Sequence, residues 1–170
     1  MYPDFKELLS IFNDHKVKYL VVGGYAVSFH AQPRATKDLD ILIKADTANA
    51  AAVYAALAAF GAPLQELTPD DFIEQGKFYR MGHPPLMVDI LPEIAGVRFD
   101  AAWKKRIEVT IDPQTGTKAF FISSDDLVTA KLATGRPEDL ADAAILRKVA
   151  PQISKPKQKT KTARKKQPGV

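Results

Sequence analysis

This 170-residue chain is organised around the stretch Tyr19–Lys44, YLVVGGYAVSFHAQPRATKDLDILIK. It begins with a four-residue apolar run, continues with the glycine pair Gly23-Gly24 and a short helical pattern, and ends in an alternating segment that opens with Asp38 and Asp40. Alternate residues of a strand project to the same face, so the two carboxylates are expected side by side. Two like charges at this spacing repel each other, and a divalent cation held by oxygen ligands is the usual solution.

The glycine pair predicts a site for phosphate. Without a Cβ, Gly23 and Gly24 allow the backbone to turn sharply and approach a ligand closely, and the N-terminus of the following helix offers free N–H groups to an anion. A phosphate cradle beside a metal clamp favours phosphoryl or nucleotidyl transfer. An isolated Asp-x-Asp at the start of a strand also occurs often by chance, and most such pairs are merely solvated.

A third carboxylate, Asp89, strengthens the metal interpretation. It lies inside the apolar segment Met87–Leu91, where a charge is costly without a partner. If this strand pairs beside the first, the three carboxylates suit two Mg²⁺ ions about 3.5–4 Å apart. We expect Asp38 and Asp40 to hold the metals, and Asp89 to complete one metal shell near the acceptor hydroxyl, as ligand or base.

The rest of the chain predicts an α/β (α+β) domain over residues 1–150, with a central sheet and two C-terminal helices. Apolar periodicity and turn residues define the elements. Helices are expected at 3–15, 24–31, 46–60 and 99–105, then after 123 and from 137, with a short helix after 68. Strands are expected at 17–22, 39–43, 77–81, 86–91, 107–111 and 117–122.

Charge separates the chain into two parts. Residues 151–170 contain seven lysines and arginines and no acids, which leaves 17 basic and 20 acidic residues before them. The net charge of +4 therefore belongs to the tail, which we expect to be disordered. There are no cysteines, so thiolate metal sites and cysteine nucleophiles are excluded. Neither a signal peptide nor a membrane span is recognisable, and a cytoplasmic protein is expected.

Taken together, the motifs resemble those of the nucleotidyltransferases of the DNA polymerase beta superfamily. The resemblance rests on Gly23-Gly24, on the pattern Arg34-x-Thr36-x-Asp38-x-Asp40 and on Asp89. It is greatest to a small bacterial branch that includes abortive-infection AbiEii-like toxins. This resemblance, over most of residues 15–150, implies a mixed-sheet nucleotidyltransferase fold flanked by helices, two Mg²⁺ ions and a nucleoside triphosphate (NTP) substrate.

Two further features bear on that resemblance. Many relatives carry Gly-Ser where this chain has Gly23-Gly24, so one hydroxyl contact to phosphate is missing; Gly-Gly is common in the toxin-like branch. Members also often carry a helix with a lysine before a Gly-Arg-Pro-x-Asp-like turn, and the segment from Lys131 to Asp142 is similar. Lys131 thus resembles the triphosphate-binding lysine of the family, although it is also placed like a surface lysine of an amphipathic helix.

The accessory residues leave alternatives open. Arg34 either contacts the triphosphate or pairs with a core carboxylate, and Thr36 either binds a phosphate or shapes its loop. Arg136, Asp139 and Asp142 are expected to form a structural network that joins the last two helices.

The expected activity is Mg²⁺-dependent transfer of a nucleoside monophosphate from an NTP to an acceptor hydroxyl. By resemblance, the acceptor is a tRNA 3′ end or a protein side chain, and the setting is toxin–antitoxin or phage defence with a protein partner. The basic tail suggests RNA or tRNA binding through phosphates, or only solubility. Two rivals are a non-catalytic nucleotide-binding antitoxin of the same fold and an RNA-binding protein that acts through its tail.

Overall fold

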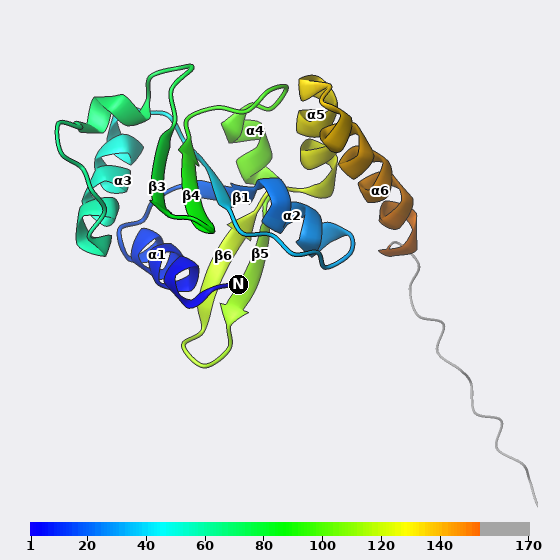
Figure 1. The fold of residues 1–170 in the computed structure, drawn as a ribbon, viewed down its shortest axis with the longest axis horizontal. Coiled ribbons are helices and arrows are strands. Elements are labelled where there is room, and N and C mark those ends of the chain that lie inside the picture. The colour runs from blue at the N-terminus through cyan, green and yellow to red at the C-terminus, as the bar shows by residue number, and fades with distance from the viewer. Residues whose placement is uncertain (154–170) are drawn as a thin grey trace, which may run out of the picture.

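The computed structural model describes the backbone of residues 1–153 and the side chains as far as Val149. Helices and strands alternate along most of the chain (Figure 1). Their order is α1 (Pro3–Asp14), β1 (Tyr19–Val22), α2 (Gly23–His30), β2 (Leu39–Ile43), α3 (Thr47–Phe60), the 3₁₀ helix η1 (Pro69–Phe72), β3 (Tyr79–His83), β4 (Leu86–Leu91), α4 (Phe99–Lys104), β5 (Ile107–Asp112), β6 (Thr117–Phe121), α5 (Ser124–Thr134) and α6 (Pro137–Ile153).

One mixed sheet organises the described residues, in the strand order β3-β4-β2-β1-β6-β5. Strand β2 pairs antiparallel with β1 and parallel with β4, and β1 pairs parallel with β6. Two antiparallel hairpins, β3–β4 and β5–β6, complete the two edges. The expected mixed α/β fold is confirmed.

Strands β1 and β2 form the centre of the hydrophobic core because both are apolar and paired on both sides. Every residue of β1 is buried, and in β2 the alternate residues Leu39, Ile41 and Ile43 have no exposed surface. Asp40, between them, is only half-buried and faces the other way. Leu42, on the same face as Asp40, is also buried, so Asp40 is the one residue of β2 that is not fully buried.

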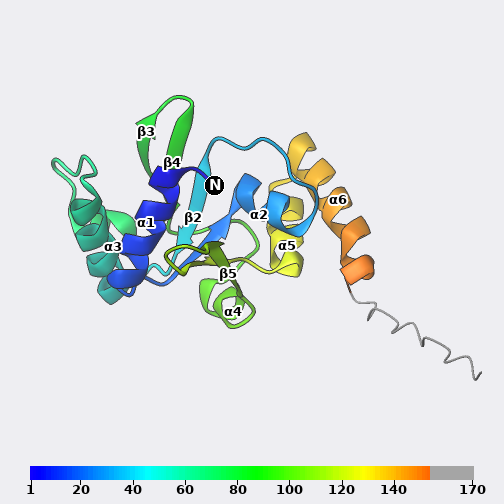
Figure 2. The same cartoon turned by 90° about the horizontal axis from the view of Figure 1, so that it is seen from below.

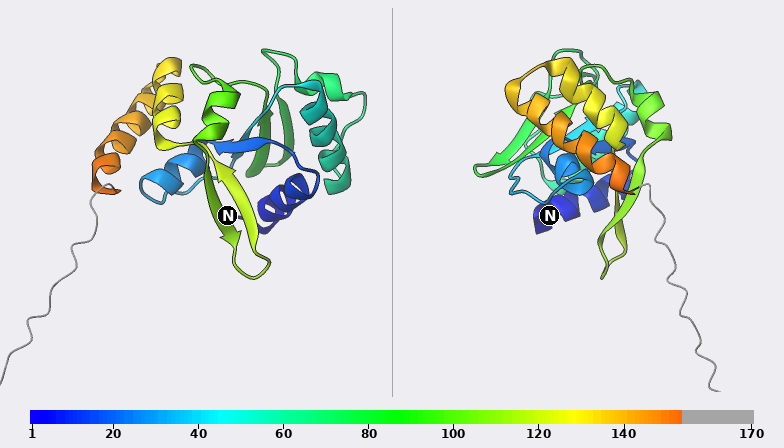
Figure 3. Two further views of the ribbon diagram at one scale, coloured as in Figure 1. Left: turned by 180° about the vertical axis from the view of Figure 1, so that it is seen from behind. Right: turned by 90° about the vertical axis from the view of Figure 1, so that its right-hand side faces the viewer.

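The helices cover the sheet on two sides (Figures 1 and 2). Helices α1 and α3 pack against each other on one side, and α2, α5 and α6 gather on the other, where α5 and α6 lie side by side (Figure 3). Helix α3 has the predicted ends: Asp46 accepts a hydrogen bond from the Asn49 N–H at its start, and Gly61 ends it in the left-handed conformation.

The element boundaries differ from the sequence-based ones by a few residues. Strand β1 begins at Tyr19 rather than at residue 17, because Val17 still belongs to the turn that follows α1. Helix α6 runs to Ile153, past the expected domain end at 150. The predicted disorder of the tail concerns residues that lie largely outside the described part of the chain. Within the described part, no helix has the length and apolar character needed to cross a membrane.

Candidate active site

The pairing of β2 with β4 brings two of the predicted carboxylates together. Asp40 and Asp89 are direct partners in the register of these parallel strands. Side chains of such partners project to the same face of a sheet, so the two carboxylates lie on neighbouring strands on one face. Asp38 is exposed and immediately precedes β2, two residues before Asp40. The expectation that the Asp89 strand pairs beside the Asp38–Asp40 strand is confirmed.

The glycine pair is required by close approaches at the start of α2. Gly23 has a φ of +60°, and a Cβ on it would overlap with Oδ2 of Asp40. A Cβ on Gly24 would lie 2.5 Å from Oγ1 of Thr36. The backbone N–H of Gly24 also favours the charged form of the Asp40 carboxylate. The missing Cβ atoms therefore admit Asp40 and Thr36 to the helix N-terminus, where an anion is favoured.

The environment of Asp40 disfavours its negative charge. Burial, followed by repulsion from Asp89 and Asp38, raises its pKa from 3.8 to about 6, against the opposing effects of Lys131 and the Gly24 N–H. A perturbed carboxylate in a cleft is typical of a functional site. Because two other carboxylates cause part of the shift, a bound cation would relieve the same repulsion.

Asp89 is held by an arginine that the sequence reasoning missed. Arg80 on β3 is the register partner of Asp89 across the hairpin, and its Nε and Nη2 donate to the two carboxylate oxygens, each at 2.6 Å. The Asp89 side chain is 10% exposed, so this bidentate pair satisfies an otherwise costly charge. One indication of this pair is present in the sequence. In the alternating segment Tyr79-Arg80-Met81, Arg80 projects to the face opposite buried Met81.

The chemistry of Asp38, Asp40 and Asp89 fits Mg²⁺, because all their donors are oxygen. The three carboxylates do not converge on a single position where a metal ion could bind. Among the described residues no three carboxylate or imidazole side chains form a ready metal-binding group. Asp89 instead gives both oxygens to Arg80. The two-metal assignment stays a prediction, and it requires Asp89 to exchange Arg80 for a cation.

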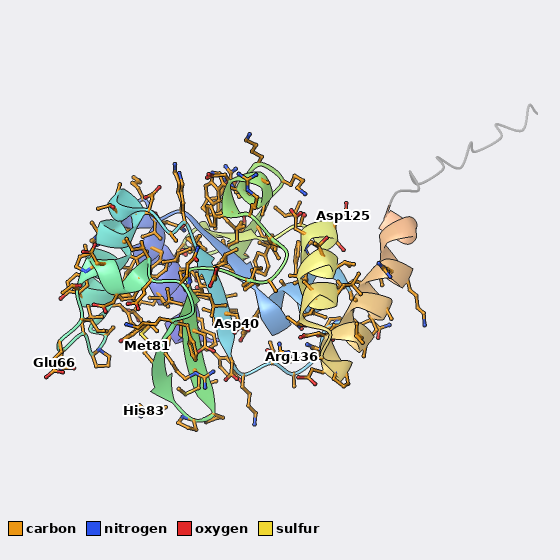
Figure 4. All side chains as sticks on the ribbon, turned by 90° about the horizontal axis from the view of Figure 1, so that it is seen from above. Asp40, Glu66, Met81, His83, Asp125 and Arg136 are labelled. Carbon is orange, nitrogen blue, oxygen red and sulfur yellow. The ribbon has the colours of Figure 1, made fainter. Side chains whose placement is uncertain are left out.

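A cleft of about 200 Å³ adjoins Asp40 between the sheet and α5. Gly23, Gly24, Asp40 and Lys131 line it together, so four of the predicted site residues meet at one place. Figure 4 shows Asp40 on the sheet and Arg136 at the start of α6, on opposite sides of this region. The apolar part of the wall, not foreseen from the sequence, comes from Val22, Leu91, Ile94, Ala95, Leu127 and Ala130.

Lys131 enters the cleft as part of an ion-pair network. Its Nζ lies 2.5 Å from Oδ1 of Asp139 and 3.1 Å from Oδ2 of Asp142. The Lys131 side chain is 13% exposed, so the surface alternative is wrong. Arg136 and Thr134 donate to Oδ2 of Asp139, as expected for a network that joins α5 and α6. Burial alone would raise the pKa of Asp139, but the hydrogen bonds from Lys131, Thr134 and Arg136 lower it to about 2.

Arg34 and Thr36 do not line this cleft, although Thr36 lies against Gly24 and Arg34 shares Asp142 with Lys131. Arg34 donates to both oxygens of Asp142, at 2.5 and 3.1 Å, which is the second of the two roles considered for it. Both residues line a separate cavity of about 630 Å³ with Tyr25 and Phe29. We place the candidate active site at the smaller cleft because that cleft contains Asp40 and the N-terminus of α2.

Comparison with known proteins agrees with the fold and the motifs. The sequence profile of a family described as "Nucleotidyltransferase of unknown function (DUF6036)" matches residues 4–161. No curated protein matches the chain. The family description supports a nucleotidyltransferase, whereas the DNA polymerase beta superfamily and its AbiEii-like branch remain predictions. Since the match spans nearly the whole chain, the protein belongs to the DUF6036 family of nucleotidyltransferases of unknown function.

Proposed function

We propose that the protein transfers a nucleoside monophosphate from an NTP to an acceptor hydroxyl in a reaction that depends on Mg²⁺. The observation that carries the proposal is the pairing of Asp40 with Asp89 on one sheet face, beside the glycine N-terminus of α2 and Lys131. Asp38, Asp40 and Asp89 would hold the Mg²⁺ ions. When bound, these ions would neutralise charge on the triphosphate and on the attacking oxygen.

Groups of the protein itself would bind the phosphates and accept the proton of the acceptor hydroxyl. N–H groups at the start of α2 and Nζ of Lys131 would bind the phosphates. The acceptor oxygen forms a bond to the α-phosphorus as the bond to the bridging oxygen of pyrophosphate breaks. The acceptor proton passes to a carboxylate or to water, and Asp89, as metal ligand or base, is the candidate to receive it once Arg80 releases it. The products are the nucleotidylated acceptor and pyrophosphate.

A second candidate function is nucleotide binding without turnover, as in an antitoxin of the same fold. The observation that favours it is the occupation of two predicted functional groups by protein partners: Arg80 holds Asp89, and Asp139 with Asp142 holds Lys131. The raised pKa of Asp40 supports a bound cation at this site, which either function would use, so only an assay for transfer separates the two.

Only the transfer reaction yields a labelled acceptor and pyrophosphate. The purified chain is incubated with Mg²⁺, NTPs labelled on the α-phosphate, and total RNA or cell lysate. Label in a macromolecule together with released pyrophosphate supports transfer, and the variant Asp38→Ala/Asp40→Ala should abolish both. Transfer that survives this double substitution would refute the assignment. Saturable NTP binding without pyrophosphate release would support the non-catalytic alternative.

The biological setting belongs to the same proposal. We propose that the acceptor is an RNA 3′ end or a protein side chain, in a toxin–antitoxin or phage-defence system with a protein partner. Growth arrest on expression of the wild-type chain, but not of Asp38→Ala/Asp40→Ala, supports a toxin role. Equal growth with both chains contradicts it.

A further inference from the structure

The exposed edge of the sheet continues the row of active-site residues. Asp40 pairs with Asp89, and Asp89 pairs with Arg80, so a single row crosses β2, β4 and β3. Met81, which alternates with Arg80, is buried on the opposite face, and Figure 4 shows it on the β3–β4 hairpin with His83 at its tip. The face that carries Asp40 therefore extends outward along the hairpin toward solvent.

Arg80 has unused binding capacity on this face. Its side chain is 52% exposed although two of its donors contact Asp89. A guanidinium carries five N–H donors in a planar fork that matches phosphate as well as carboxylate. A cation that took Asp89 would leave Arg80 charged, exposed and next to the reacting centre.

An aromatic ring accompanies that charge. Phe78 is 55% exposed, an unusual position for a large apolar side chain, and Cζ of Arg80 lies 5.4 Å from the centre of its ring. On the same face, Gly82 follows Arg80 by two residues and carries no side chain to obstruct the surface. A cation beside an exposed ring is the combination that single-stranded nucleic acids bind, through phosphate and base stacking.

We propose that Phe78 and Arg80 form the acceptor subsite and that the acceptor is the end of a single-stranded nucleic acid. The inference rests on the proposed transfer function and names its acceptor class. The terminal base stacks on Phe78. Arg80 binds the adjacent phosphate once Asp89 has left Arg80 to bind the metal. Arg80 is thus both a positioning residue for Asp89 and a contact to the acceptor.

The exchange has a signature that a purely structural arginine would lack. Removing the charge of Arg80 frees Asp89 and should strengthen binding of a divalent cation, while it weakens binding of the oligonucleotide. Removing the ring of Phe78 should weaken only the oligonucleotide. Opposite effects of one substitution on two ligands cannot arise from general loss of folding.

The experiment uses the full chain and two probes. Mn²⁺ binding is titrated by electron paramagnetic resonance. In the presence of Mg²⁺, which the exchange of Asp89 requires, a short single-stranded oligoribonucleotide with 2-aminopurine at its 3′ end reports stacking at the subsite by fluorescence quenching, so that binding elsewhere on the chain contributes little to the signal. The variants are Arg80→Gln, Arg80→Lys and Phe78→Ala. Lys77→Gln is the matched control, because Lys77 carries the same charge nearby, is exposed, and pairs with Glu74.

We expect Phe78→Ala to weaken the quenching-detected affinity at least about fivefold, the lower end for loss of one base stack. Arg80→Gln should weaken it by a similar factor and strengthen Mn²⁺ binding, with Arg80→Lys intermediate and Lys77→Gln unchanged. Unchanged quenching in both Phe78→Ala and Arg80→Gln would overturn the proposal. So would normal labelling of a protein acceptor by both variants. Transfer surviving in Asp38→Ala/Asp40→Ala would refute the proposed function separately, without altering these binding results.

Discussion

Replacing Asp40 with asparagine should stabilise the metal-free protein at neutral pH. Asparagine has nearly the same shape, keeps an oxygen to accept the Gly24 N–H, and removes the charge that burial, Asp89 and Asp38 disfavour. A substitution that raises stability at a proposed catalytic residue is expected where function maintains a strained arrangement. The same change should abolish nucleotidyl transfer.

The magnitude follows from the pKa of the carboxyl group. In the folded protein the pKa is about 6, against 3.8 for the free side chain. Because the folded state holds the proton more tightly, stability is greatest below pH 3.8 and falls as the pH rises through 6. A difference of about two pH units corresponds to about 3 kcal/mol at pH 7. Allowing for solvent screening, we expect Asp40→Asn to add about 1–3 kcal/mol at pH 7 and about half as much at pH 5.

The assay is chemical denaturation of wild-type and Asp40→Asn protein in a chelator, at pH 5 and 7. Asn49→Ala provides a contrast, because Asn49 is buried and bonded to the backbone of Lys18 and Lys44, so its loss should destabilise at both pH values. Adding Mg²⁺ should stabilise the wild-type chain and not Asp40→Asn. If Asp40→Asn lowers the free energy of unfolding at pH 7 in chelator, or raises it equally at both pH values, the reasoning is refuted.

Three other predictions follow from the contacts. Gly24→Ala should cost about 1–3 kcal/mol of stability by overpacking against Thr36, and the added substitution Thr36→Ala should recover part of it; no recovery in thermal unfolding would contradict this. Asp139→Asn should cost about 3–5 kcal/mol in denaturation because it weakens the pairing of nearly buried Lys131, and a loss below about 1 kcal/mol would show that Asp142 suffices. Deleting residues 154–170, which carry seven cations, should weaken RNA binding and flatten its salt dependence in filter binding, whereas unchanged binding would leave the tail without that role.

Local patterns in the sequence were enough for much of the fold. The apolar run before Gly23, the alternation after Asp38 and the caps of α3 depend on residues a few positions apart, so they can be recognised without knowing the tertiary structure. For the same reason the glycine pair could be identified, although its tight approaches to Asp40 and Thr36 could not. The acidic residues Asp38, Asp40 and Asp89 were also foreseen, together with the pairing of their strands.

The partners of Arg34 and of Asp89 became visible only in the folded chain. Arg34 contacts Asp142 from 108 residues away, and Arg80 reaches Asp89 because the β3–β4 register makes them partners. A buried charge attracts whichever opposite charge the folded backbone brings within reach, and that depends on strand order and register rather than on local pattern. The acidic residues and the glycine turn could therefore be identified from the sequence. Packing of the folded chain determined that Asp89 pairs with Arg80 and that Lys131 pairs with Asp139 and Asp142.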